Sequence, residues 1–368
     1  MKLEFCGIRD FRNISSSDIY FTNGVNLIKG DNAEGKTSVL EAVYVFARGR
    51  SFRTNKEAEI IKFGADKAKL DIEYADSRRK NKMSVSYFRE EKRKLYKNGV
   101  NIRKTSEFIG NFRAILFTPD HLSLIKSAAS DRRLFMDIAL SQITPNYINY
   151  MRSYSILLGE RNALLKDKNA EGKDASILFE VLGEEMAKEA AAITVLRSKY
   201  CEKLSSAVGG YFEKMTGGKE KTNVRYESCI SEDKEELKDK KRVTELYYKK
   251  FTENKERELY FRTSLYGPQK DDIDIELNGY SSRRFCSQGQ QRSLAIAMKL
   301  SEGDISAEVT GEYPVYLLDD ISGELDEKRN GFFMSQLKDR QIIITSCSVS
   351  DTKGFDNVIT MKNGEAVF

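Results

Sequence analysis

Hydrophobic positions change their spacing twice along the chain. Up to about residue 119, short apolar runs and alternating patterns predominate, and these are typical of β-strands. They predict strands at 25–28, 69–74, 82–88, 92–96 and 114–117. A single amphipathic helix is expected over 37–46, and Asn98-Gly99 is expected to form a turn. The first part of the chain is therefore predicted to be α/β.

From about residue 120 the spacing becomes helical. Asp131 is the expected N-cap of a helix over 132–140. Longer helical patterns cover 147–165 and 176–208, and we expect them to form an antiparallel hairpin with arms of roughly 30–50 Å. The highly charged segment 232–258 is compatible with a helix or with a flexible insertion.

The α/β pattern returns after about residue 261. Strands are expected at 274–277, 315–318, 341–345, 358–361 and 366–368, with helices over 290–300 and 326–337. The predicted fold class is therefore α/β, with a head that a mainly helical lobe interrupts in sequence. Residues 1–119 and 261–368 would form the head, and residues 120–260 the inserted lobe.

Composition narrows the class of protein. The chain has 61 basic and 56 acidic side chains, an excess too small to indicate a nucleic-acid partner without local clustering. None of the five cysteines belongs to a C-x-x-C pair, so no zinc knuckle is predicted, and scattered thiols fit a reducing cytoplasm. The first residues do not resemble a signal peptide, and no uncharged apolar stretch approaches the ~20 residues of a membrane span. We therefore expect a cytoplasmic protein with no membrane partner.

The clearest motif is a phosphate-binding loop, GDNAEGKT, which follows a predicted strand and opens a predicted helix. Its backbone N–H groups and the helix N-terminus would cradle phosphate oxygens. Lys36 would neutralise the β- and γ-phosphates of ATP, and the Thr37 hydroxyl would ligate Mg²⁺. The predicted nucleotide-binding residues are Gly30, Asp31, Asn32, Ala33, Glu34, Gly35, Lys36 and Thr37.

Two acidic residues follow the buried strand predicted at 315–318. Asp319 is the candidate second Mg²⁺ ligand, acting through water. Asp320 is the candidate catalytic residue that orients or polarises the attacking water, together with Lys36. The alternative is two solvated acids after a core strand, which the upstream phosphate-binding loop makes the weaker interpretation.

A second helix start lies between these motifs and resembles the signature of ABC-type ATPases. Its residues are Ser287, Gln288, Gly289 and Gln290. In that superfamily the signature of one subunit caps the γ-phosphate held by another, so two ATP molecules are enclosed in a head-to-tail dimer. The segment 322–326, with Glu324 and Asp326, resembles the D-loop, and Thr345 or Ser346 stands where many ABC proteins have a switch histidine. The only histidine, His121, is assigned no catalytic role.

The ordered set of motifs resembles the RecF family over residues 2–346. The similarity includes Phe11-Arg12-Asn13 and the segments 47–54, 117–120 with the pair Arg132-Arg133, 267–272, 285–292 and 317–326. Gln269-Lys270 replaces the His-Arg pair usual in the family, and no Q-loop glutamine is evident near Pro119. Asp320 stands where many ABC ATPases have glutamate, so hydrolysis is expected to be slow.

This resemblance implies an ATP- and Mg²⁺-dependent homodimer that binds gapped or single-stranded DNA without sequence preference. It implies action with RecR and RecO to load recombinase, and roles in replication, recombination, repair and the SOS response. Candidate DNA contacts are Arg48, Arg50, Arg53, Arg132 and Arg133. The basic segment 78–97 is an equally good candidate, or a solvated hairpin face. Two alternatives stay open: the nucleotide-binding subunit of an ABC transporter, and a nucleotide-binding scaffold without useful turnover.

Overall fold

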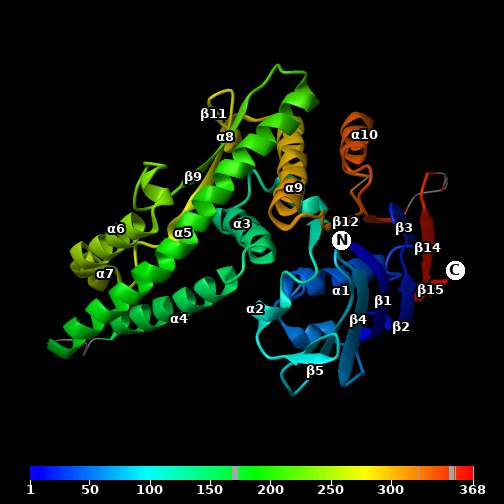
Figure 1. The fold of residues 1–368 in the computed structure, drawn as a ribbon, viewed down its shortest axis with the longest axis horizontal. Helices are drawn as coiled ribbons and strands as arrows, with labels where there is room; N and C mark the ends of the chain where they lie inside the picture. The colour runs from blue at the N-terminus through cyan, green and yellow to red at the C-terminus, as the bar shows by residue number, and fades with distance from the viewer. Residues whose placement is uncertain (168–172, 322, 348–351, 353, 368) are drawn as a thin grey trace. The chain divides into compact units, whose positions relative to one another are not determined.

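The computed structural model describes residues 1–167, 173–321, 323–347, 352 and 354–367. The chain forms two compact units. Unit 1 combines Met1–Ser123 with Gln288–Phe368, and unit 2 is Leu124–Ser287 (Figure 1). In the described part of the chain, no helix is both long enough and apolar enough to cross a membrane.

An antiparallel sheet forms one layer of unit 1, in the strand order β2-β1-β4-β5-β6-β7. Its strands are β1 (Lys2–Phe11), β2 (Ile14–Tyr20), β4 (Lys67–Ala75), β5 (Lys80–Phe88), β6 (Lys94–Lys97) and β7 (Val100–Ile102). Along β4 and β5 every second side chain is buried, the period expected of strands with one covered face. Asn98 and Gly99 both have positive φ, which makes the tight turn between β6 and β7.

The second sheet of unit 1 is largely parallel, in the order β15-β14-β3-β13-β12-β8. It consists of β3 (Val25–Lys29), β8 (Ala114–Phe117), β12 (Val315–Asp319), β13 (Ile342–Ser346), β14 (Asn357–Lys362) and the antiparallel edge strand β15 (Glu365–Val367). Strands β8, β12 and β13 are buried at every position, as strands covered on both faces are. The carboxyl ends of β3, β12 and β13 therefore meet at one edge.

Helix α1 (Lys36–Arg48) joins the two layers of unit 1. It contacts β1 in the antiparallel sheet and β8, β12 and β13 in the parallel sheet. All but two of its residues are buried, including Glu41. The remaining helical segments of the unit are η1 (Glu57–Ile60), α2 (Thr105–Phe108), η2 (Pro119–Ser123), α9 (Gln288–Thr310) and α10 (Glu327–Gln336).

Unit 2 is built around α5 (Lys173–Thr216), a helix of 44 residues and about 66 Å. It packs against α3 (Ala129–Ile143), α4 (Tyr147–Lys166), α6 (Lys240–Glu253) and β9 (Thr222–Glu227). Helices α4 and α5 run side by side, as Figure 1 shows. The other elements are η3 (Glu236–Lys238), α7 (Lys255–Phe261), η4 (Pro268–Lys270), β10 (Asp272–Leu277), β11 (Tyr280–Ser281) and α8 (Ser282–Phe285).

In unit 2 one local expectation is corrected and one open alternative is decided. The N-cap of α3 is Ala128, and Asp131 lies in the first turn, where its carboxylate accepts the Ala128 N–H at 3.2 Å. The charged segment 232–258 is largely helical, because Val243, Tyr247 and Phe251 of α6 form a buried stripe. Residues 261–287, which the sequence grouped with the head, lie in unit 2, where β10 pairs with β9 along six residues.

Candidate nucleotide site

The phosphate-binding loop connects β3 to α1. Gly35 precedes the helix with φ of 100°, a left-handed conformation that favours glycine. A Cβ at Gly30 would lie 2.5 Å from the carbonyl oxygen of Met361, so a side chain there would displace β14. Asn13 fixes the loop from outside, because its Nδ2 donates to the Ala33 carbonyl at 2.7 Å and its Oδ1 accepts the Ser38 hydroxyl at 3.0 Å.

The ammonium group of Lys36 is held inside this loop. Its Nζ donates to the carbonyl oxygens of Gly30 and Asp31, each at 2.7 Å. The residue is buried, so its charge is directed at the concave side of the loop rather than at bulk water. An anion in the loop would therefore meet a positioned cation together with the N-terminus of α1.

Hydroxyl and carboxylate groups converge beside the loop at the carboxyl edge of the parallel sheet. Both Thr37 Oγ1 and Thr345 Oγ1 donate to Asp319 Oδ1, at 2.9 and 2.8 Å. Thr345 Oγ1 also accepts the backbone N–H of Asp320 at 3.1 Å. The pairing of Asp319 with Thr345 between β12 and β13 fixes this arrangement. Thr345 thus connects the candidate metal ligand to the candidate catalytic acid.

The donor set fits Mg²⁺. Mg²⁺ prefers oxygen ligands, uses one or two carboxylates and keeps several waters or phosphate oxygens. The Thr37 hydroxyl and the Asp319 carboxylate provide two such oxygens beside the phosphate-binding loop. No group of three or more His, Cys, Asp or Glu side chains among the described residues could hold a metal by itself.

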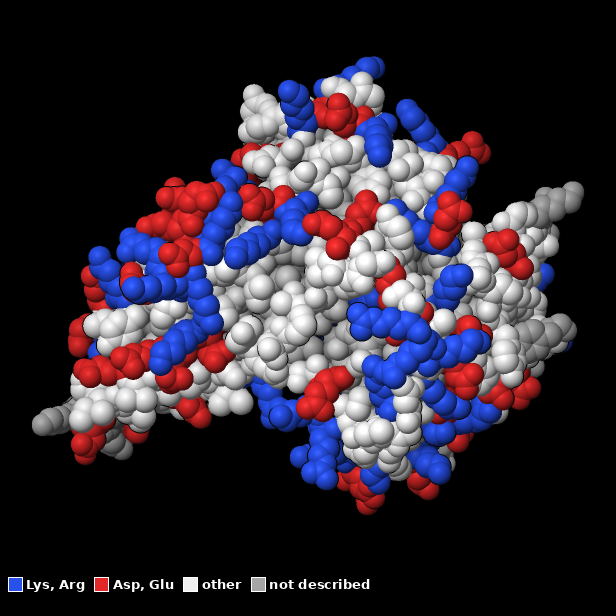
Figure 2. All heavy atoms as spheres, in the orientation of Figure 1, with Lys and Arg blue, Asp and Glu red and all other residues white. Residues whose placement is uncertain are grey.

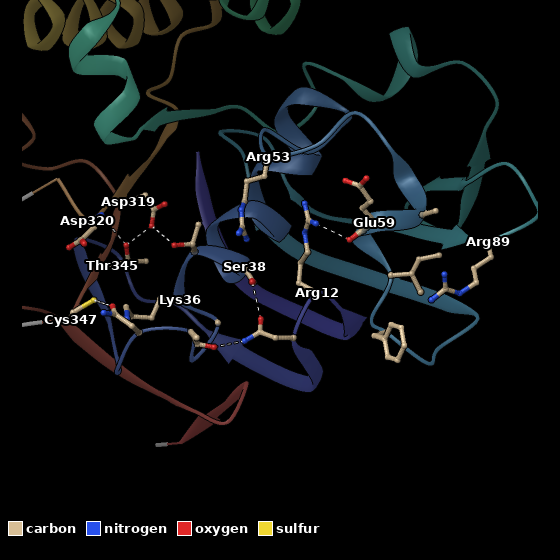
Figure 3. Close-up of a pocket in the computed structure, with 18 residues that line it drawn as sticks. Arg12, Lys36, Ser38, Arg53, Glu59, Arg89, Asp319, Asp320, Thr345 and Cys347 are labelled. Carbon is tan, nitrogen blue, oxygen red and sulfur yellow. Dashed lines mark hydrogen bonds between the residues drawn. The ribbon is translucent and has the colours of Figure 1, made fainter.

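A cavity of about 740 Å³ opens beside the loop, within the size range of small-molecule sites. Figure 3 shows Lys36, Asp319 and Asp320 at one end of it and Arg89 at the other. Its lining comprises Arg12, Asn13, Asn32, Ala33, Gly35, Lys36, Thr37, Ser38, Arg53, Ala58, Glu59, Ile61, Phe63, Arg89, Asp319, Asp320, Thr345 and Cys347. The cavity therefore extends well beyond the phosphate-binding loop.

Glu41 is a charged centre that sequence reasoning missed. Its carboxylate is fully buried in α1 and accepts from Arg12 at 2.6 Å, from Ser51 and from Arg53 at 3.4 Å. These contacts fix the 50–54 segment to the helix that carries the loop. Arg12 and Asn13 lie in a segment that the family resemblance had marked, but nothing in that pattern showed that they line the cavity.

The part of the signature helix that belongs to unit 1, from Gln288 onwards, contacts the D-loop region. Gly289 is packed against Arg329, whose Nη2 would lie 2.7 Å from an added Cβ. Arg329 donates to Ser293 Oγ at 2.9 Å and pairs with Asp326, while Arg292 pairs with Glu324 at 3.4 Å. Ser287 and Gln288 are exposed, Gln290 is half-buried and Ser346 is buried at the end of β13. Ser322 lies outside the described residues.

The five candidate DNA-contacting arginines differ in exposure. Arg50 and Arg53 are exposed, whereas Arg48 is half-buried and burial lowers its pKa. Arg132 is 1% exposed, and its Nε and Nη2 donate to the Asp272 carboxylate at 2.8 and 2.7 Å. Half-buried Arg133 donates to the Asp271 carbonyl at 2.7 Å. The guanidinium of Arg132 is therefore buried and paired, which argues against a DNA contact at this residue.

The surroundings of His121 explain its protonation state. Its Nδ1 accepts the backbone N–H of Thr118 at 3.0 Å. Burial, followed by the positive charges of Lys299 and Arg48, holds its pKa well below the ordinary value, so the native imidazole is neutral.

Comparison with known proteins agrees with this geometry. The family model described as RecF/RecN/SMC N terminal domain matches residues 2–367. The DNA replication and repair protein RecF of Clostridioides difficile (strain 630) is 32% identical over 376 residues, covering 100% of this chain and 98% of that protein. The protein of the same name from Thermoanaerobacter sp. (strain X514) is 33% identical over 360 residues, with 98% of each covered.

Solved structures give the same result. The recombination mediator protein RecF–ATP of the RecFOR pathway matches with a TM-score of 0.92 and 32% identity, covering 100% of this chain and 97% of that one. An SMC head bound to the C-winged helix domain of ScpA matches with a TM-score of 0.57 at 15% identity, which shows a shared fold alone. The expected fold, an α/β ATPase head with a helical lobe, is therefore confirmed, and the chain belongs to the RecF family.

Proposed function

We propose that this protein is an ATP-dependent DNA-binding protein of RecF type, which hydrolyses ATP slowly and uses the hydrolysis as a switch. The observation that carries the proposal is the convergence of Lys36, Thr37, Asp319 and Thr345 at one edge of the parallel sheet. This is the set of groups that triphosphate binding with a hydrated Mg²⁺ requires. The names of the relatives support a function in DNA replication and repair, and the RecF–ATP structure supports ATP as the nucleotide.

Each residue has a distinct part in hydrolysis. Lys36 neutralises the β- and γ-phosphates from its position inside the loop. Bound Mg²⁺ would supply charge neutralisation of the triphosphate, with Thr37 and Asp319 holding it. Asp320 orients the attacking water and accepts its proton, and Thr345 positions both acids through its hydroxyl. A side chain one methylene shorter than glutamate holds that water less closely, which makes turnover slow.

We place the signature helix opposite a second copy's triphosphate. Helix α9 is 23 residues long, and its first residue, Gln288, is exposed together with Ser287. A helix N-terminus favours an anion through its unpaired N–H groups and its dipole. In a head-to-tail homodimer, each triphosphate would therefore lie between one copy's Lys36 and the other copy's Ser287.

DNA binding is assigned to exposed basic surface. Figure 2 shows Lys and Arg side chains gathered over the antiparallel sheet of unit 1. Arg50 and Arg53 are exposed in the same unit, and these two residues with the β5–β6 region are the proposed phosphate contacts. Ion pairs of exposed lysines there, such as Lys80–Glu4 at 2.9 Å, contribute little and can exchange for phosphate contacts. Action at gapped DNA with RecR and RecO, in the cytoplasm, is part of the proposal.

Light scattering of the full chain with and without MgATP and gapped DNA tests this function. Wild-type protein should dimerise with MgATP, and gapped DNA should raise its ATPase rate. Lys36→Ala should do neither, because it removes the only ammonium group in the loop that the structure describes. Lys328→Ala, which changes an exposed lysine of α10, is the control. A Lys36→Ala protein that still dimerises with MgATP, or a wild-type ATPase rate indifferent to DNA, would contradict the proposal.

A further inference from the structure

Strand β11 and the following helix α8 of unit 2 each expose one large aromatic side chain. Tyr280 is 65% exposed and Phe285 is 69% exposed, and their ring centroids lie 5.9 Å apart at 67°. Leaving such large apolar rings in water forgoes the stabilisation that their burial would give. Within the described residues, these rings therefore form a solvent-facing aromatic pair with no established role.

Backbone pairing fixes the position of Tyr280 in this pair. Leu277 pairs with Tyr280, and the intervening Asn278 and Gly279 both have positive φ, which is the geometry of a tight two-residue hairpin turn. Asn278 also fixes the neighbouring chain. Its N–H donates to the Lys221 carbonyl at 2.8 Å and its Oδ1 accepts the Lys221 N–H at 2.9 Å. The turn that precedes Tyr280 is therefore fixed beside the Lys221 segment.

Four exposed basic side chains lie on the segments that carry or adjoin the aromatic pair: Lys219 and Lys221 in the chain leading into β9, and Arg283 and Arg284 in α8. Arg283 pairs with Asp272 at 3.0 Å, while Glu220 is the one acid among residues 217–222. Residues 278–285 contain no acidic side chain. At this end of unit 2, Figure 2 shows Lys and Arg atoms beside uncharged atoms, with some carboxylates among them. The surface is thus aromatic and locally basic.

We propose that this surface, defined by Lys219, Lys221, Tyr280, Arg283, Arg284 and Phe285, binds single-stranded DNA by stacking bases on its aromatic rings. Exposed aromatic rings bordered by cations suit an unpaired strand, whose bases present free π-faces and whose phosphates meet the arginines and lysines. A duplex keeps its bases stacked on one another, so it would engage only the cations. The inference rests on the proposed DNA-binding function and assigns the single-stranded side of that function to unit 2.

Affinity for oligo(dT) and for a blunt duplex of equal length, measured by fluorescence anisotropy on the full chain with MgATP, tests this assignment. Tyr280→Ala/Phe285→Ala should weaken oligo(dT) binding about tenfold or more, since each stacked base contributes roughly 1–3 kcal/mol, and should leave duplex binding nearly unchanged. The matched control is Tyr260→Ala/Phe261→Ala, which removes another exposed aromatic pair of unit 2 with centroids 5.1 Å apart. Arg284→Ala should reduce the salt dependence of oligo(dT) binding by about 0.7 in log–log slope.

Because the chain contains no tryptophan, the fluorescence of an introduced tryptophan reports on base stacking directly. In Tyr280→Trp the sole indole should be quenched when oligo(dT) stacks on it, and in the control Tyr260→Trp it should not. Three results would overturn the inference: an unchanged oligo(dT) affinity of the double variant, equal losses of affinity for both DNA forms, or a loss of MgATP-dependent dimerisation in the absence of DNA. The last result would show that the surface contacts a second copy of the chain. If wild-type protein binds neither DNA form, the proposed function itself fails; if it binds duplex only, the inference alone fails.

Discussion

Thr345→Val is the sharpest perturbation of the proposed catalytic arrangement. Thr345 is 1% exposed, and its hydroxyl donates to Asp319 at 2.8 Å, lies 3.5 Å from the Leu318 carbonyl oxygen and accepts the Asp320 N–H at 3.1 Å. Valine preserves the shape of the side chain but removes the contacts with both Asp319 and Asp320. A hydrogen bond to a charged group contributes about 1.5–3 kcal/mol, so losing the alignment of both acids should lower kcat by roughly 10- to 150-fold.

The affinity for ATP should change much less, because Lys36 and its loop contacts do not involve Thr345. Single-turnover hydrolysis at saturating MgATP, together with equilibrium nucleotide binding, separates the two effects. Thr345→Ser is the control, since serine keeps the hydroxyl and should retain most of the activity. The reasoning is refuted if the valine protein hydrolyses ATP within about twofold of wild type, or if the serine protein loses as much as the valine protein.

Three further predictions follow from single residues. Asp320→Asn should keep ATP binding but slow hydrolysis, so dwell time on gapped DNA should lengthen in single-molecule assays; an unchanged dwell time would instead indicate a scaffold without useful turnover. Glu258→Gln should lower the unfolding free energy of unit 2 by roughly 3–5 kcal/mol, because the fully buried Glu258 pairs with the buried Arg161 at 2.8 Å. Hydrogen exchange of α4 in urea measures this loss, and Glu256→Gln, which changes an exposed glutamate, is the control. The pKa of native His121 is lowered, so the stability that its neutral form contributes is complete above the unfolded-state pKa of about 6.5 and is lost as pH falls through the native pKa. His121→Asn should therefore make the urea midpoint of unfolding depend less on pH between roughly pH 7 and 5. An unchanged pH dependence would count against burial of a neutral imidazole.

Local periodicity was sufficient for the elements that carry the site. The run at 25–28, the GDNAEGKT motif and the amphipathic pattern over 37–46 predicted a strand, a loop and a helix, and the structure has β3, the loop and α1 there. The strand before Asp319 was predicted on the same grounds. Parallel strands that end in polar residues converge at one sheet edge, so the meeting of Thr37 with Asp319 follows from topology once the strand order is known.

Contacts between residues distant in sequence could not be read in this way. Arg132 looked like a surface cation, but its partner Asp272 is 140 residues away, and only the folded chain shows that the pair buries the guanidinium. Glu41 lay unremarked within a helical pattern, although it joins Arg12 and Arg53 to the loop-bearing helix. The aromatic pair Tyr280 and Phe285 likewise required the folded chain, which brings a ring of β11 and a ring of α8 within 5.9 Å of each other.

Completion of each nucleotide site by a second copy is the central claim, and mixing two inactive variants tests it most directly. Lys36→Ala removes the loop ammonium, and Ser287→Arg blocks the exposed signature start, so neither variant alone should dimerise or show DNA-stimulated hydrolysis. An equal mixture should recover up to about half of wild-type activity, because only mixed dimers form and each has one of its two sites intact. An inactive mixture in which mixed dimers are shown to form, or a Ser287→Arg protein that is active alone, would contradict a site shared between copies.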